Sequence, residues 1–200
     1  MAPNSGRPAE AVVVIDMQND YCHSNGVFAG AGLVIDDLPG LVGRINTLVG
    51  SARSAGVPVI WVRMEWADDA AVGILAQRSP FLRDSGLRAG TWGSDLVSEL
   101  DVRPEDAVVV KPRFSAFYRT ELDEALAGVT RITVAGVRTD FCVESTVRDA
   151  FFRDFEVVVA RDAVAGYFPE LHENSLRVMG TVFARIDSVD TIVTSFEAVR

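Results

Sequence analysis

Six short apolar runs, separated by amphipathic stretches, constrain the fold more than any other feature of the sequence. Each run is rich in valine and isoleucine and is apolar at successive positions, which is typical of a strand buried on both faces. The runs cover residues 11–15, 57–63, 106–111, 131–137, 155–160 and a weaker 184–189. Helical periodicity or helix-start signals mark the intervening segments 36–56, 120–128, 142–155, 169–179 and 190–198.

Strands that alternate with helices predict an α/β domain, because parallel strands need a crossover and that crossover is almost always right-handed. A chain of 200 residues with 48% hydrophobic content can bury one substantial core. We therefore expect a single doubly wound, Rossmann-like domain over residues 11–200, with a mostly parallel six-stranded sheet and helices on both faces. Residues 1–10, rich in proline, glycine and alanine, are expected to form a flexible N-terminal tail.

The segment 64–91 lies between the second and third apolar runs and has no strong periodicity. An irregular stretch of this length in a compact domain more often forms a lid or a binding loop than a second domain. Ligands of doubly wound sheets bind beyond the carboxyl ends of the strands. We therefore expect this segment to lie near a ligand site, and whether it acts as a lid stays open.

The charge balance narrows the class of partner. A net charge of −9 disfavours nucleic acid and anionic membranes, which are bound mainly by clustered lysine and arginine. The first ten residues contain no apolar signal core, and no apolar run approaches the roughly 20 residues of a membrane span. We expect a cytoplasmic protein that acts on a small molecule, with Cys22 and Cys142 as free thiols.

Three reactive side chains follow the ends of different predicted strands. Asp16 follows the first strand, Lys111 ends the third, and Cys142 follows the fourth at the start of a helical pattern. A helix N-terminus favours the thiolate form of Cys142, Lys111 adds positive charge, and Asp16 is a candidate acceptor for the thiol proton. A buried structural thiol, a strand-end turn residue and a solvated lysine are the alternatives at these positions.

Two non-hydrolytic classes also stay open for an α/β domain with these residues. A phosphorylated receiver-like switch needs an acceptor aspartate after the third strand, where this chain has Lys111. A non-enzymatic binding protein on the same fold needs an inert thiol at Cys142. The reactivity of that thiol separates the binding protein from an enzyme.

Three passages resemble the signature blocks of a known enzyme family. They read "AVVVIDMQNDYC", "VVKPRFSAFYRTEL" and "VAGVRTDFCVESTVRDAFFRDFEVVVARDAVAG". They are similar to the isochorismatase-like cysteine hydrolases, which include nicotinamidases, N-carbamoylsarcosine amidohydrolase, ureidoacrylate amidohydrolase, biuret hydrolase and streptothricin hydrolase. The resemblance covers nearly the whole chain in order, and further passages look most like the ureidoacrylate and carbamoyl amidase branch.

The resemblance implies a catalytic triad of Cys142, Asp16 and Lys111. It further implies a cis peptide bond between Val137 and Arg138, with the backbone amides of Arg138 and Cys142 forming an oxyanion hole. Similar proteins are homodimers or homotetramers, so the resemblance implies a homo-oligomer.

The segment after the second strand bears on cofactors. Nicotinamidases of this family carry histidine metal ligands there, whereas this chain reads "MEWADDAAVGILAQ" without a histidine. We therefore expect no metal and no other cofactor. The expected enzyme is a metal-independent cysteine amidohydrolase that cleaves a C–N bond of a small amide, ureido or carbamoyl substrate through a thioester acyl-enzyme. The alternatives are an isochorismatase, which releases pyruvate from a vinyl ether, and a lactam hydrolase of the streptothricin hydrolase type.

Polar and aromatic residues near the predicted strand ends are candidate substrate contacts. Aromatic residues also serve cores, Gln18 could instead hold the catalytic loop, and the Arg138 side chain could recognise a carboxylate or project outward. Two roles stay open for His23, which could form a hydrogen bond within its loop or contact the substrate. The candidates are Gln18, Tyr21, His23, Glu65, Trp66, Trp92, Phe117, Tyr118, Arg138 and Phe141.

Overall fold

A single six-stranded sheet forms the centre of the molecule. The computed structural model describes residues 9–197. The strand order is β3-β2-β1-β4-β5-β6 and every neighbouring pair is parallel, which is the order of Rossmann-type folds and confirms the predicted architecture. The strands are β1 (Glu10–Ile15), β2 (Val59–Met64), β3 (Ala107–Lys111), β4 (Arg131–Val137), β5 (Glu156–Ala165) and β6 (Arg185–Asp187).

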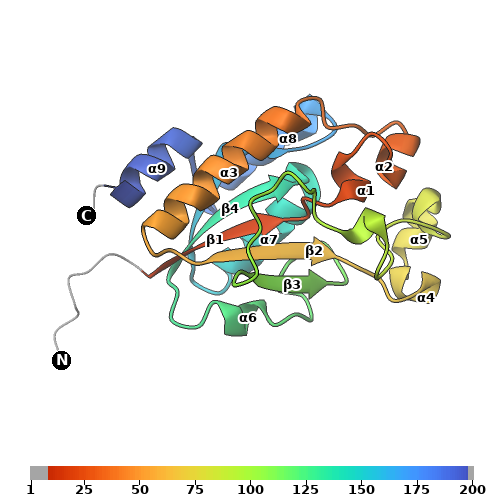
Figure 1. Ribbon diagram of the computed structural model, residues 1–200, viewed down its shortest axis with the longest axis horizontal. Helices are drawn as coiled ribbons and strands as arrows, with labels where there is room; N and C mark the ends of the chain where they lie inside the picture. Colours follow the sequence, from red (N-terminus) through yellow and green to blue (C-terminus); the bar gives the residue numbers. More distant parts are fainter. Residues whose placement is uncertain (1–8, 198–200) are drawn as a thin grey trace.

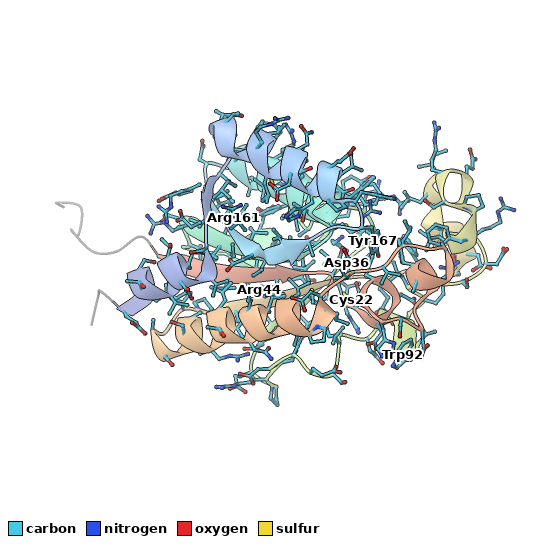
Figure 2. All side chains as sticks on the ribbon, turned by 90° about the horizontal axis from the view of Figure 1, so that it is seen from above. Cys22, Asp36, Arg44, Trp92, Arg161 and Tyr167 are labelled. Atoms are coloured by element: carbon cyan, nitrogen blue, oxygen red, sulfur yellow. The ribbon has the colours of Figure 1, made fainter. Side chains whose placement is uncertain are left out.

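Helices cover both faces of the sheet. The long helix α3 and the C-terminal α9 lie on one face, and α7 and α8 lie on the other (Figures 1 and 2). The principal helices are α3 (Leu38–Ser54), α6 (Leu122–Ala125), α7 (Glu144–Phe151), α8 (Pro169–Val182) and α9 (Val189–Glu197).

Helix α3 shows how the sequence pattern positions a helix on the sheet. The side chain of Asp37 accepts a hydrogen bond from the Gly40 N–H at 3.0 Å, so Asp37 is the N-cap of this helix. The apolar stripe of the predicted helix faces the core, with Leu41 and Ile45 among its buried members. This packing fixes the helix against the sheet.

Two ends of the predicted pattern differ from the structure. Strand β1 begins at Glu10, which pairs in register with Arg131 of β4, so the last residue of the predicted tail belongs to the sheet. The remaining part of that prediction, residues 1–8, lies outside the described residues, as does the last residue of the predicted helix 190–198. Val108 and Val110 are 48% and 43% exposed because β3 is an edge strand, although its sequence predicts burial on both faces.

Short helices gather at the end of the sheet toward which the strands point (Figure 1). Part of this cluster comes from the segment 64–91, which is therefore not wholly irregular. The two ends of this segment are joined by backbone hydrogen bonds. Trp66 N–H donates to the Leu87 carbonyl and Ala89 N–H donates to the Trp66 carbonyl, both at 2.9 Å. The short elements are α1 (Asn19–Cys22), α2 (Val27–Gly30), α4 (Asp69–Val72), α5 (Leu75–Arg78), η1 (Pro80–Leu82) and η2 (Trp92–Ser94).

Within residues 9–197, every helix is too short or too polar to cross a membrane.

Candidate active site

The candidate site lies where the strand order reverses, between β1 and β4. Asp16 directly follows β1 and has a left-handed φ of 52°, with its N–H donating to the Val62 carbonyl at 2.8 Å. Opposite Ile15 in β4 stands Gly136, whose φ is 107°. A Cβ at Gly136 would overlap the Ile15 carbonyl oxygen, so glycine allows the two strands to approach closely here. This approach brings the residues that follow β1 and β4 together.

Lys111 and Asp16 form a completely buried ion pair. The Lys111 Nζ lies 2.7 Å from Asp16 Oδ2, and the lysine also donates to the Arg113 carbonyl at 3.0 Å. Burial raises the pKa of Asp16 above its usual value, and the positive charge of Lys111 opposes that rise. Burial acts to lower the pKa of Lys111, but its interactions with Asp16 and Cys142 outweigh this effect, so the lysine pKa is raised. The lysine therefore stays protonated beside the carboxylate.

Cys142 lies in a π-helical turn, η3 (Thr139–Val143), that leads directly into α7. The Thr146 hydroxyl donates to the Cys142 carbonyl at 2.7 Å and fixes the turn to the first turn of α7. The Cys142 thiol is buried, and Asp16 and Lys111 lie close enough to it to act on its pKa. All three side chains of the predicted triad are thus brought together.

The surroundings of Cys142 favour the thiol over the thiolate, although the helix N-terminus and Lys111 act in the other direction. Burial, followed by the negative charge of Asp16, raises the pKa of Cys142 to about 12, and the opposing effect of Lys111 is smaller. The expectation rested on the helix N-terminus and the lysine, and it did not account for the complete burial of the sulfur. At neutral pH these interactions favour the thiol form of Cys142.

The peptide bond between Val137 and Arg138 is cis, at the position that the family resemblance implied. The Arg138 carbonyl accepts hydrogen bonds from the Phe141 and Val143 amides at 3.2 and 3.0 Å, which closes the turn that carries Cys142. The use of the Arg138 and Cys142 amides as an oxyanion hole stays a prediction.

A cavity of about 70 Å³ opens beside Cys142. Of the predicted substrate contacts, Tyr21, Trp66, Arg138 and Phe141 line it. The other lining residues are Phe28, Met64, Leu75, Ser79, Leu82 and Phe114, beside Cys142 itself. Four of these come from the segment 64–91, so the predicted position of that segment near the ligand site agrees with the structure.

Tyr21 and Trp66 are held firmly at the cavity wall. The Tyr21 ring stacks on Phe28 with centroids 4.4 Å apart, and its hydroxyl points at the Met64 sulfur at 3.4 Å. The Trp66 indole N–H donates to the Pro112 carbonyl at 3.1 Å. Both side chains are almost fully buried, so they present fixed aromatic surface to a ligand.

Gln18 holds the backbone and does not line the cavity. Its Nε2 donates to the carbonyls of Met64 and Ser94, each at 2.8 Å, and its Oε1 accepts from the Met64 N–H at 2.8 Å. Both amide hydrogens are therefore used in joining the end of β2 to the loop after β1. Of the two roles considered for Gln18, the structure supports holding the catalytic loop.

The remaining predicted contacts lie away from this cavity in the described structure. His23 and Trp92 meet edge to face, with ring centroids 5.1 Å apart, and Trp92 is 49% exposed. Figure 2 shows Trp92 at the rim of the short-helix cluster. Glu65 pairs instead with Arg63, at 3.2 Å between Oε2 and Nη2.

Phe117 and Tyr118 also point elsewhere. The Phe117 ring packs against Phe155, and the Arg153 guanidinium lies 4.5 Å from its centroid. Tyr118 is 45% exposed beside Arg119. The loop after β3 turns these two side chains away from the thiol, while Phe114 of the same loop reaches the cavity.

Sequence reasoning missed several of the lining residues for identifiable reasons. Met64 ends β2 and so lies at the same edge as Asp16, a signal that strand ends alone could have provided. Leu75 and Leu82 carry no signal beyond their place in the segment 64–91, because apolar residues of short loop helices look like core residues in sequence.

No group of three or more histidine, cysteine, aspartate or glutamate side chains suited to a metal ion occurs among residues 9–197. The metal independence of the reaction stays a prediction.

Comparisons with known proteins agree with this geometry. A family model described as the isochorismatase domain matches residues 10–191. The chain is 35% identical over 196 residues to the ureidoacrylate amidohydrolase RutB of Methylobacterium radiotolerans, with 89% of this chain and 76% of the relative covered.

Solved structures show the same likeness. A cysteine hydrolase from Pseudomonas syringae pv. phaseolicola has a TM-score of 0.87 at 25% identity, covering 98% of this chain and 100% of that chain. N-carbamoylsarcosine amidase from Thermoplasma acidophilum has a TM-score of 0.72 at 28% identity, covering 90% and 96%. The sequence match and the shared fold together show that this chain is a member of the isochorismatase-like hydrolase family.

Proposed function

We propose that the chain is a metal-independent cysteine amidohydrolase, which cleaves a C–N bond of a small amide, ureido or carbamoyl substrate through a thioester intermediate. The observation that carries this proposal is the buried cluster of Cys142, Asp16 and Lys111 beside a cavity. The similarity to a ureidoacrylate amidohydrolase and to an N-carbamoylsarcosine amidase supports it.

In the first step, Cys142 attacks the carbonyl carbon of the substrate. Because the thiol pKa is about 12, the proton has to leave the sulfur as the new C–S bond forms, and Asp16 is the neighbouring carboxylate that accepts it. The backbone amides of Arg138 and Cys142 stabilise the negative charge that develops on the carbonyl oxygen. Each such donor is typically worth about 3 kcal/mol in the transition state.

In the second step, the tetrahedral intermediate collapses. Asp16 returns the proton to the departing nitrogen, the C–N bond breaks, and an amine or ammonia leaves behind a thioester on Cys142. Asp16 then takes a proton from water as the water attacks the thioester, and the proton passes to the departing sulfur. The thiol and the carboxylate are both restored.

Lys111 makes this proton relay possible. A carboxylate buried as deeply as Asp16 would take up a proton without a compensating charge, and a neutral carboxylic acid cannot act as a base. The ammonium group at 2.7 Å keeps Asp16 ionised and fixes the orientation of its oxygens. Lys111 therefore acts by positioning and charge and does not itself exchange a proton with the substrate.

The test is amine release from a panel containing 3-ureidopropionate, N-carbamoylglycine, biuret, nicotinamide and a simple lactam, with isochorismate as a rival substrate. We expect release of ammonia or amine from one class of amide by the native protein, and loss of that activity in Cys142→Ala. Mass spectrometry of a rapidly quenched reaction should find an acyl group on Cys142.

Cys22→Ala is the matched control, since Cys22 is a second buried thiol outside the proposed chemistry. It should keep the activity. Pyruvate release from isochorismate that persists in Cys142→Ala would overturn the proposal, as would the absence of any acyl adduct during turnover.

A further inference from the structure

Arg138 is a buried cation in the wall of the cavity that contains Cys142. Its side chain is 12% exposed and lies among mainly apolar and aromatic neighbours. Burying a guanidinium in such surroundings is unfavourable unless its charge and its hydrogen bonds are satisfied. The groups that already contact the Arg138 guanidinium limit what else it can bind.

Asp140 occupies one edge of the guanidinium. The Arg138 Nη2 lies 2.7 Å from Asp140 Oδ2, and Nε lies 3.3 Å from Oδ1. Within the described residues, all hydrogen bonds from the Arg138 side chain go to this carboxylate. Since the contacts use Nε and Nη2, the end of the fork formed by Nη1 and the second Nη2 hydrogen is left for another acceptor.

Two aromatic rings lie against the same group. The guanidinium carbon lies 4.3 Å from the ring centroid of Phe141 and 4.6 Å from that of Tyr167. Tyr167 follows β5 and lies at the end of the sheet where the short helices gather (Figure 2). Its hydroxyl donates to the Tyr21 carbonyl at 2.9 Å, so the ring is itself fixed. These contacts restrict the directions from which a further ligand can reach Arg138.

We propose that the substrate carries a carboxylate and that Arg138 binds it through the free end of the fork. This inference rests on the proposed amidohydrolase function and specifies the substrate class as an anionic acid with a cleavable amide or ureido group. A carboxylate is planar and accepts two parallel N–H bonds, which matches the geometry that Asp140 and the two rings leave open. A neutral group at the same place leaves buried N–H groups unpaired.

The test compares two pairs of ureas that differ only in charge. The pairs are 3-ureidopropionate with (3-hydroxypropyl)urea, and N-carbamoylglycine with (2-hydroxyethyl)urea. The readout is the ratio of kcat/KM for the acid to kcat/KM for the alcohol, together with calorimetric binding of both members to Cys142→Ala. We expect the native protein to prefer the acid by roughly 10- to 100-fold, mainly through KM.

Asp140→Asn and the double variant Arg138→Gln with Asp140→Asn separate recognition from structure. Both lack the ion pair, so any loss of order in the turn that carries Cys142 affects them alike and lowers activity on acid and alcohol together. Arg138 differs between them, and we expect the acid preference in Asp140→Asn but not in the double variant. Thermal denaturation of the two variants shows whether both are folded.

Several results would overturn the inference. One is an acid-to-alcohol ratio near one in the native protein, and another is a ratio that the double variant preserves. Turnover of neutral amides in the wider panel, with neither acid bound nor cleaved, would reject carboxylate recognition while leaving the amidohydrolase function intact. Failure of the amidohydrolase function itself is recognised separately, by the absence of an acyl adduct on Cys142 with every panel compound.

Discussion

The carboxylate of Asp16 and the ammonium group of Lys111 lie 2.7 Å apart with no exposed surface on either side chain. Each charge compensates the other for the loss of hydration, and removing one partner leaves an uncompensated buried charge. In the proposed reaction the same pair sets the protonation state of the general base. Stability and catalysis therefore depend on one contact at the centre of the sheet edge.

Lys111→Met should abolish most of the activity while leaving a folded protein. Without the ammonium group, burial raises the Asp16 pKa further and the carboxyl group becomes neutral at neutral pH. We expect kcat/KM at pH 7 to fall by about 100-fold or more, the usual contribution of a general base. Part of the activity should return as the pH is raised. A variant whose pH profile keeps the native shape would contradict the role given to Lys111.

The native pH profile should show an acid limb that belongs to Asp16. The reaction needs the ionised carboxylate, and burial raises the pKa of Asp16 above 3.8, so activity is lost on acidification at a higher pH than an exposed aspartate would give. Toward alkaline pH the rate should stay level, because the pKa of Lys111 is raised above 10.5 and the thiol pKa is about 12. Steady-state kinetics between about pH 3 and about pH 10 measure this profile.

Alkylation of Cys142 should be slow at neutral pH in the absence of substrate, so, contrary to the expectation from the sequence, the reactivity of the resting thiol does not separate an enzyme from a binding protein. The thiolate is the reactive form, and a thiol pKa of about 12 leaves little of it at pH 7. The rate with iodoacetamide should rise about tenfold for each pH unit. Peptide mass mapping follows both cysteines, and Cys22, whose pKa is also raised by burial, serves as the internal reference. Fast, pH-independent labelling of Cys142 at neutral pH would show that the resting group is a thiolate.

Gly136→Ala should prevent the site from assembling. The added methyl group would overlap the Ile15 carbonyl, and alanine is unfavourable at a φ of 107°. We expect destabilisation of about 3 kcal/mol or more and a low yield of folded protein. Gly43→Ala is the matched control, since a Cβ at that exposed helical glycine meets no other atom. Equal melting temperatures for the two variants would refute the steric argument.

Gln18→Ala should destabilise the chain through unpaired backbone groups. The Met64 and Ser94 carbonyls and the Met64 N–H would each lose a buried partner. A loss of about 3 kcal/mol is expected, which corresponds to a melting temperature about 6 to 12 °C lower for a chain of this size. Gln77→Ala, at an exposed position of α5, should change the melting temperature little. Equal thermal denaturation curves for Gln18→Ala and Gln77→Ala would show that the hydrogen bonds of Gln18 are not needed for stability.

The elements that carry the triad were predictable because their positions follow from backbone geometry. Parallel strands end at one edge, so Asp16, Lys111 and Cys142 could be placed together from the order of the apolar runs. Strand β4 was predicted with its actual bounds, and β5 extends five residues beyond the predicted end, through a register shift between Val134 and Gly136. Periodicity cannot indicate such an irregularity in advance.

Substrate contacts were predicted less well because loops decide them. Phe114, Phe117 and Tyr118 are close in sequence, yet only the first lines the cavity among these three, since the loop after β3 turns between them. The raised pKa of Cys142 could not be predicted from the sequence either, because the pKa of a thiol depends on how completely neighbouring elements cover it. The local pattern of residue types predicts neither the direction in which a loop turns nor how deeply a side chain is buried.

The volume of the cavity has a further consequence. At about 70 Å³ it has room for a few water molecules, whereas pockets that enclose small-molecule ligands usually measure about 300 Å³ or more. Leu75, Ser79 and Leu82 form part of its wall, from two short helical turns between anchored ends. The side chains of these three residues therefore limit the size of the ligand that fits beside Cys142. Substitutions in these turns can change the shape of the cavity without altering Asp16, Lys111 or Cys142, which lie at or beyond the ends of strands.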